Sequence, residues 1–287
     1  MNIQGILQKT AMAFKRCGIP SARLDAEVLL SCCLKTQRLT LYKYPGRILT
    51  DDELCRFQKL AERRRKGEPV AYIIGQKEFW SLCLKVDEHV LIPRPETECL
   101  VEEVLNTFAA SFRHNLRILD VGTGSGAISI ALASEIKDVR IEATDISAAA
   151  LAIARENAGN NGVHESIVFH CGNMFEPVSG KFDAIVSNPP YISDEEFTHL
   201  SDGVRLYEPK EALMAGPRGT KYFSILIHEG APFLKEDGWL FMEIGAAQRK
   251  NIEAMLIESD LYDSISFKRD YAGIDRIAKA RRKTTHG

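Results

Sequence analysis

The chain has 287 residues, 45% of them hydrophobic and 26% charged, a balance typical of a globular protein with a sizeable core. No apolar run approaches the length of a membrane span, and the polar start Met1-Asn2-Ile3-Gln4 lacks a signal-peptide layout, so we expect no membrane association. The seven cysteines form no CxxC pair, and the seven histidines show no HExxH spacing. These patterns indicate reduced thiols, a cytoplasmic location and no metal site.

The net charge of −2 hides an uneven distribution along the chain. Residues 1–85 hold 16 Lys+Arg against 8 Asp+Glu, whereas residues 86–287 hold 21 against 31. This split predicts an N-terminal part that meets an acidic partner, either a protein or a nucleic acid. The excess could equally be the solvated face of one helix around Arg63-Arg64-Arg65-Lys66.

Residues 1–68 have the pattern of a small helical domain. Apolar residues recur at helical spacing from residue 3 to residue 17, and Ser21 can cap a second helix. The capping-box pattern Thr50-Asp51-Asp52-Glu53 opens a third helix, which Gly67 ends. Because the segment contains no nucleophile–base pair and no metal-ligand spacing, we interpret it as a recognition domain.

Residues 69–90 are predicted to form a β-hairpin linker. The stretches Val70–Ile74 and Phe79–Val86 are rich in β-forming residues, and Gly75-Gln76-Lys77 between them can turn the chain. The third predicted domain, residues 91–287, opens with Ile92-Pro93-Arg94-Pro95-Glu96. Its arginine between two prolines lies in a stiff, extended segment, either a rigid linker or a wall of a binding site.

Strand and helix signals alternate through the rest of the chain, which predicts an α/β fold with a mostly parallel sheet and helices on both faces. Residues 192–218 are polar and irregular, and we expect a lid or substrate loop there. The last two strands are too close in sequence for a helical crossover and should pair antiparallel. The predicted strands cover residues 117–121, 139–144, 166–171, 182–187, 239–244, 264–269 and 274–279.

A glycine loop follows the first strand of this sheet. Gly122-Thr123-Gly124-Ser125-Gly126 lets the backbone approach a ligand and places a helix N-terminus beside it. Asp145, at the end of the next strand, can accept hydrogen bonds from both ribose hydroxyls. The spacing is GxGxG, not the GxGxxG of pyrophosphate binders. Asp120 before the loop can face a positively charged amino-acid group, which favours S-adenosylmethionine as the cofactor.

The tetrapeptide Asn188-Pro189-Pro190-Tyr191 follows the buried strand 182–187. Two prolines cannot continue a sheet ladder, so the chain leaves the sheet at the edge where ligands bind. The Asn188 side-chain oxygen and the Pro189 carbonyl can accept hydrogen bonds from a planar –NH2 group, and the Tyr191 ring can cover it. An ordinary tight turn is the alternative. Beside an adenosyl site, the tetrapeptide predicts methyl transfer to an amide or exocyclic amine nitrogen.

The motifs together resemble those of the bacterial release factor glutamine methyltransferases (the HemK/PrmC family). Ile92–Glu98 is the most specific of them, because Asn-Pro-Pro-Tyr also occurs in DNA adenine and some RNA methyltransferases. The matching segments span nearly the whole chain: Ala22–Glu27, Gly67–Gly75 with Glu78-Phe79, Ile92–Glu98, Asp120–Gly126, Asn188–Tyr191, Tyr207–Pro209 with Ala212-Leu213, and Asp270 with Gly273–Arg276.

The resemblance implies a seven-stranded, Rossmann-like class I methyltransferase sheet joined to a helical N-terminal domain. It implies S-adenosylmethionine as methyl donor, S-adenosylhomocysteine as product, and as substrate the glutamine N5 of the Gly-Gly-Gln loop in class I peptide chain release factors. Asn173-Met174 departs from the usual acidic-aromatic pair at the adenine. By position, the cofactor would contact Asp120, Gly122, Thr123, Gly124, Ser125, Gly126, Asp145, Asn173, Met174 and Asn188, and the glutamine would contact Asn188, Pro189, Pro190 and Tyr191, with Arg94 and Glu96 at the substrate entrance.

Two other functions remain open from the sequence. A nucleic-acid N-methyltransferase could use the same tetrapeptide, but the acidic balance of residues 86–287 argues against long phosphate contacts, so we expect no stable nucleic-acid binding. An adaptor without cofactor binding is the non-enzymatic alternative. Asp120, the glycine loop, Asp145 and Asn188 are all present, which disfavours it.

Overall fold

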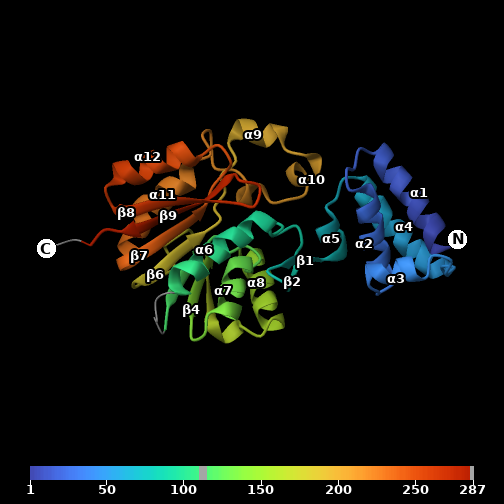
Figure 1. Ribbon diagram of the computed structural model, residues 1–287, viewed down its shortest axis with the longest axis horizontal. Helices are drawn as coiled ribbons and strands as arrows, with labels where there is room; N and C mark the ends of the chain where they lie inside the picture. The colour runs from blue at the N-terminus through green and yellow to red at the C-terminus, as the bar shows by residue number, and fades with distance from the viewer. Residues whose placement is uncertain (110–114, 285–287) are drawn as a thin grey trace. The chain divides into compact units, whose positions relative to one another are not determined.

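The structure, a computed structural model, describes residues 1–109 and 115–284 and contains two compact units (Figure 1). The first unit comprises residues 1–76 with 201–207, and the second comprises residues 77–200 with 208–287. The return of residues 201–207 to the first unit was not expected from the sequence. The predicted domain ranges 1–68, 69–90 and 91–287 stay predictions, and residues 110–114 and 285–287 of the last range lie outside the described residues.

The first unit is helical, as the sequence predicted. Its core gathers apolar side chains from several helices, among them Phe14, Leu29, Leu30 and Phe57, which are fully buried. The predicted capping box is confirmed, with Thr50 Oγ1 accepting from the Glu53 N–H and the Glu53 carboxylate accepting from the Thr50 N–H. The helices are α1 (Ile3–Arg16), α2 (Ala22–Cys33), α3 (Arg38–Lys43), α4 (Asp51–Arg65), α5 (Val70–Ile74) and α10 (Asp202–Arg205).

The expected hairpin lies a few residues later than predicted. Residues 70–74 form the short helix α5, not a strand, and Gly75 caps it with a left-handed φ of 76°. Five apolar residues without a clear period fit either structure, and here Pro69 precedes a helical turn that buries Tyr72 and Ile73. The hairpin consists of β1 (Gln76–Phe79) and β2 (Leu82–Lys85). Trp80 and Ser81 join them, both at positive φ, as a type I′ hairpin turn requires.

The second unit is built on a seven-stranded sheet, which confirms the predicted fold class. Its order is β5-β4-β3-β6-β7-β9-β8, parallel from β5 to β7, with β9 antiparallel to both of its neighbours. The antiparallel pairing of the last two strands is therefore also confirmed. The strands are β3 (Arg117–Val121), β4 (Arg140–Asp145), β5 (Ile167–Cys171), β6 (Phe182–Ser187), β7 (Leu234–Glu243), β8 (Tyr262–Arg269) and β9 (Asp275–Arg282).

Helices cover both faces of this sheet. The predicted Ser147 cap is confirmed, since its Oγ accepts from the Ala150 N–H at 3.1 Å. The segment 192–218 is not irregular throughout, because α9 (Asp194–His199), α10 and η3 (Lys210–Ala212) interrupt it. The helices of this unit are η1 (Pro95–Thr97), α6 (Glu98–Ala109), α7 (Ala127–Glu135), α8 (Ala148–Asn160), η2 (His164–Ser166), α9 (Asp194–His199), η3 (Lys210–Ala212), α11 (Lys221–Gly230), η4 (Ala231–Phe233) and α12 (Arg249–Ser259).

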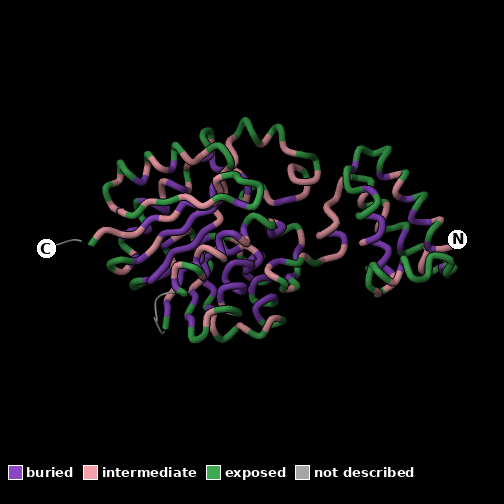
Figure 2. Tube along the Cα trace, viewed as in Figure 1, coloured by how far each residue is buried: buried purple, intermediate pink, exposed green. Residues whose placement is uncertain are grey.

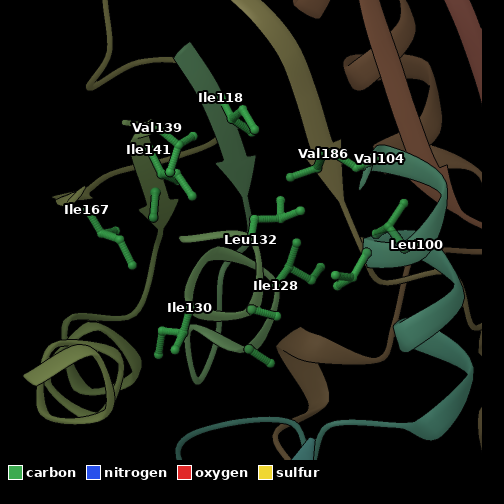
Figure 3. Packing of buried hydrophobic residues seen from close by; sticks show 14 of the residues in the cluster. Leu100, Val104, Ile118, Ile128, Ile130, Leu132, Val139, Ile141, Ile167 and Val186 are labelled. Atoms are coloured by element: carbon green, nitrogen blue, oxygen red, sulfur yellow. The ribbon is translucent and has the colours of Figure 1, made fainter. Parts of the chain in front are cut away.

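Successive strand residues supply two separate cores. Ile118 packs with α6, α7 and α8 on one face, while its neighbour Leu119 packs with α11 and α12 on the other. Figure 2 shows buried stretches following the strands, and Figure 3 shows side chains of α6 and α7 facing those of β3, β4 and β6. Each fully buried Leu or Ile side chain contributes about 1.5–3 kcal/mol. This burial holds the strands in register and fixes the loops at their ends.

The strand order identifies where a ligand can bind. From β3 the chain winds outward through β4 and β5, and then returns to β6 on the other side of β3. The carboxyl ends of these parallel strands therefore meet at a topological switch point, the edge where α/β sheets bind ligands. The glycine loop after β3, Asp145 at the end of β4 and the tetrapeptide after β6 all lie at this edge.

Candidate active site

The glycine loop after β3 has the backbone that only glycine adopts easily. Gly122 and Gly124 have φ of 76° and 55°, and a Cβ built on either would meet nothing within 4 Å. Gly126, at φ 82°, is different, because its Cβ would lie 3.0 Å from Ile130 and 3.3 Å from Ala154. The first two glycines therefore border open space, whereas the third lets α7 and α8 pack closely.

Asp120, which we expected to contact the cofactor, is not among the residues that line the cavity, and its contact with the cofactor stays a prediction. It is fully buried, and its Oδ2 accepts hydrogen bonds from the hydroxyls of Thr123 (2.7 Å) and Ser129 (2.6 Å). Its Oδ1 has no hydrogen-bond partner among the described residues. Burial raises the pKa of this carboxyl to about 6, against the opposing effect of the two hydroxyls. Asp120 thus supports the loop from behind.

Asp145 lines the cavity at the end of β4. Its Oδ2 accepts from the Gly124 N–H and its Oδ1 from the Ser147 N–H, both at 2.9 Å. Burial raises the pKa of the carboxyl, while these backbone donors oppose the rise. Each oxygen keeps a further lone pair, so the carboxylate can still accept from two hydroxyls of a ligand.

Asn188 and Pro189 both line the same cavity. The Asn188 Nδ2 donates to Thr97 Oγ1 at 3.1 Å, so the amide nitrogen is already occupied. Within the described part of the chain, no residue donates a hydrogen bond to the Asn188 Oδ1 or to the Pro189 carbonyl. Two free acceptors are therefore adjacent in the sequence. We call this pair, the Asn188 Oδ1 and the Pro189 carbonyl, the clamp, because together they can accept from both N–H groups of an –NH2 group.

The backbone after the clamp is tied to two other segments. The Gln248 side chain donates to the carbonyls of Tyr191 (3.0 Å) and Gly219 (3.1 Å), and accepts from the Gly245 N–H at 2.9 Å. The Tyr191 hydroxyl donates to Glu243 Oε1 at 3.3 Å. Pro190 is part of the cavity wall, whereas Tyr191 packs against the core of the α11 and α12 face. Tyr191 is therefore an anchor of the turn in this structure.

The other predicted contacts divide into those in the wall and those outside it. Asn173 and Met174 line the cavity, as do Gly122, Thr123, Gly124 and Ser125, whereas Gly126 does not. Arg94 lies outside the lining and pairs with the buried Glu208 carboxylate at 2.6 Å. Glu96 is exposed and also outside the lining. Arg94 therefore joins two loops, and a direct substrate contact by Arg94 or Glu96 stays a prediction.

Two residues that the sequence reasoning missed connect to the clamp. Thr97 donates to Glu243 Oε2 at 2.6 Å, and both side chains are buried. Burial raises the pKa of the Glu243 carboxyl to about 7, against the Thr97 hydrogen bond and the Arg276 charge. Burial and the neighbouring Glu243 also raise the pKa of Tyr191. A signal was available for Glu243, because this carboxylate directly follows the apolar run Trp239–Met242 at the end of β7.

The cavity has the size and lining of a small-molecule site. Its volume is about 490 Å³, within the usual range for ligand pockets. Its wall combines the polar groups at the ends of β3, β4 and β6 with apolar side chains such as Ile146, which is 68% exposed. Thr144 Oγ1, also in the wall, is buried without a hydrogen-bond partner among residues 1–109 and 115–284.

The described residues contain no group of three or more His, Cys, Asp or Glu side chains that could hold a metal ion. None of their helices is both long and apolar enough to cross a bilayer.

Comparison with known proteins gives matches for both units of the chain. The family model described as PrmC N-terminal domain matches residues 6–75, and that described as Methyltransferase small domain matches residues 96–205. A release factor glutamine methyltransferase of Coxiella burnetii is 45% identical, over 91% of this chain and 92% of the relative. One of Aliivibrio fischeri is 41% identical, over 96% of each chain. A crystal structure of a methyltransferase from Pyrococcus furiosus shares the fold, with a TM-score of 0.53, 20% identity, and coverage of 79% of this chain and 100% of that one.

Proposed function

The chain belongs to the release factor glutamine methyltransferase family, and from this premise we propose that it methylates a glutamine side chain of a class I peptide chain release factor. The acceptor is the amide nitrogen N5 in the Gly-Gly-Gln loop. One observation supports this chemistry above the others: two unoccupied acceptors, the Asn188 Oδ1 and the Pro189 carbonyl, border a cavity that also holds the glycine loop and Asp145.

The cavity residues fit S-adenosylmethionine. Gly122 and Gly124 leave room for a ligand against the backbone, and the unpartnered Thr144 hydroxyl offers a polar contact. Asp145 has spare lone pairs for ribose hydroxyls, and Asn173 and Met174, which the resemblance assigns to the adenine, line the same cavity. When bound, S-adenosylmethionine supplies a methyl group on a sulfonium sulfur, and the electrons of the broken C–S bond stay with sulfur in S-adenosylhomocysteine.

The clamp activates a poor nucleophile through geometry. The lone pair of an amide nitrogen is delocalised into the carbonyl, so the nitrogen reacts slowly unless it is well oriented. The Asn188 oxygen and the Pro189 carbonyl accept hydrogen bonds from its two N–H groups, and this direct contact orients the lone pair out of the amide plane. The same two oxygens stabilise the positive charge that grows on nitrogen as the N–C bond forms. After the transfer the methylated nitrogen carries a positive charge and two N–H bonds, so it is acidic and loses one proton to water, which leaves the neutral N-methyl amide.

The first unit is proposed to recognise the release factor. It overlaps the matched PrmC N-terminal domain and carries most of the basic excess of residues 1–85. A basic surface is suited to an acidic protein partner, because opposite charges speed association and fix orientation. All seven cysteines are free, which supports the reducing cytoplasm as the compartment of the reaction.

The test offers the purified protein methyl-labelled S-adenosylmethionine with a release factor, with duplex DNA and with ribosomal RNA in parallel. A release factor with its Gly-Gly-Gln glutamine replaced by alanine serves as the matched control. We expect one methyl group on that glutamine, located by mass spectrometry, and no transfer to the alanine control. Label in a nucleic acid, with none in the release factor, would contradict the proposed substrate.

A further inference from the structure

The amide of Asn188 can perform its role in only one of two orientations. A side-chain amide presents an oxygen in one direction and an –NH2 group in the other. The substrate nitrogen carries N–H bonds, so the clamp requires the Asn188 oxygen toward the substrate and its –NH2 group away from it. With the opposite orientation, N–H groups would face each other and the acceptor would be lost. Some feature of the protein must therefore select the orientation.

The structure contains a hydrogen-bond chain that makes this selection. The Asn188 Nδ2 donates to Thr97 Oγ1 at 3.1 Å, and the Thr97 hydroxyl donates to Glu243 Oε2 at 2.6 Å. A hydroxyl has one proton, and an ionised carboxylate can only accept. The Thr97 proton is therefore committed to Glu243, and its oxygen can only accept from Asn188. The amide nitrogen must face Thr97, which leaves the amide oxygen for the substrate.

We propose that Thr97 and Glu243 are positioning residues for methyl transfer, which orient the Asn188 amide through this chain of hydrogen bonds. The inference rests on the proposed function and deepens it. Neither residue touches the reacting atoms in this account. Thr97 borders the cavity beside Asn188, and Glu243 is 1% exposed behind it. Burying an ionised carboxylate costs free energy, and orienting the Asn188 amide gives Glu243 a role in the reaction.

The direction of each hydrogen bond in this chain depends on whether Glu243 is protonated. A protonated Glu243 can itself donate to Thr97, which frees the Thr97 proton to bond the Asn188 oxygen and stabilises the inverted amide. The ionisable groups that face Glu243 are Tyr191 on the turn, Arg276 on β9, Glu96 on η1 and Cys99 on α6. Burial dominates their combined effect and raises the pKa of Glu243 to about 7. Turnover should therefore fall as the pH decreases through this value.

The experiment compares Thr97→Val, Thr97→Ser and Glu243→Gln with the wild type, on a release factor whose methylated glutamine has been mapped. Valine has the shape of threonine without the hydroxyl, so kcat should fall about 10- to 100-fold, the scale of a misplaced reacting group. The affinity for S-adenosylmethionine, measured by calorimetry, should not change. Thr97→Ser keeps the hydroxyl and should retain most of the wild-type kcat. Glu243→Gln should lower kcat and remove the loss of activity on the acid side.

A double variant separates orientation from a general structural role. If Thr97 acts through Asn188, then Thr97→Val should have little further effect on kcat in an Asn188→Ala background. A loss by the full factor in that background would overturn the proposal, as would an undiminished kcat in Thr97→Val or an unchanged acid limb in Glu243→Gln. Failure of the wild type to methylate the glutamine would overturn the proposed function itself, and the proposal with it. Wild-type methylation with an unaffected Thr97→Val would overturn this proposal alone.

Discussion

Asn188 has a hydrogen bond on one side and an open cavity on the other. Its nitrogen is engaged by Thr97, while its oxygen and the Pro189 carbonyl have no donor within the described residues. Two acceptors match the two N–H groups of a glutamine amide, so the proposed mechanism requires no general base before the methyl transfer. In that mechanism, catalysis at Asn188 depends on orientation and on charge stabilisation in the transition state.

Asp145 should matter for the cofactor and little for the methyl-transfer step. Asp145→Ala removes a carboxylate that faces the cavity, so S-adenosylmethionine should bind more weakly by about 1–3 kcal/mol, the scale of lost hydrogen bonds to a charged group. Asp145→Asn keeps one acceptor oxygen and should lose less. Calorimetry measures both affinities, and kcat at saturating cofactor should stay close to that of the wild type. Unchanged affinity in Asp145→Ala would exclude Asp145 from the ribose site.

The places of site residues were predictable where they follow from the position of a residue at a strand end. Asp145 ends β4 and Asn188 directly follows β6, and both line the cavity as expected. The expected contact of Asp120 with the cofactor stays a prediction, whereas its Oδ2 accepts hydrogen bonds from the hydroxyls of Thr123 and Ser129, which the sequence did not indicate. Those contacts depend on the path of the loop, which the spacing of its glycines does not specify.

The secondary elements were predictable where local chemistry decides them. The Thr50 capping box and the Ser147 cap are interactions between residues three positions apart, so the sequence contains them completely. The segment Val70–Ile74 was wrongly predicted as a strand because its five apolar residues carry no period. Packing in the first unit determines that this segment is helical, and packing contacts are not specified by the local sequence.

The segment that supports the clamp should be sensitive to one added methyl group. Gly219 has φ of 66°, and a Cβ there would lie 2.4 Å from the Tyr191 carbonyl oxygen and 3.0 Å from the Gln248 Nε2. Gly219→Ala should therefore displace the turn after Asn188. We expect a lower kcat and a loss of about 1–3 kcal/mol in the free energy of unfolding, from strain at a left-handed backbone position and the close contact.

A matched control lies three residues earlier. Gly216 has φ of 75°, but a Cβ there would meet nothing within 4 Å. Gly216→Ala should carry the backbone strain without the contact, and its kcat should exceed that of Gly219→Ala. Thermal unfolding and steady-state kinetics on both variants make the comparison. Equal kcat in the two would mean that the Gly219 contact does not support the clamp.

At the scale of the whole molecule, the site depends on residues far apart in the sequence. Thr97 and Glu243 are 146 positions apart, and the first ends η1 while the second ends β7. The Ile92–Glu98 segment was identified as the most specific motif, yet its Thr97 had no role until the structure placed it between Asn188 and Glu243. Single-sequence patterns contain no information on such a pairing, because it exists only in the folded sheet.

The two compact units correspond to the uneven charge of the chain. The first unit takes most of the basic N-terminal residues, and the second contains the acidic remainder together with the whole cavity. The charge split was visible in the sequence, but the return of residues 201–207 to the first unit was not. There the Tyr207 hydroxyl donates to the Lys66 carbonyl at 3.0 Å, which ties a segment after the clamp to the helical unit.

Asn188 orients the substrate amide in the proposed mechanism, and single-turnover kinetics of Asn188→Ala test this role most directly. With saturating S-adenosylmethionine and release factor, the rate of methyl transfer should fall about 100-fold or more, the scale of losing one preorganised group at a developing charge. Cofactor affinity should stay close to that of the wild type, because most of the predicted cofactor contacts come from the loop after β3, from Asp145 at the end of β4 and from Asn173-Met174 after β5. A variant that transfers the methyl group at nearly the wild-type rate would contradict the clamp.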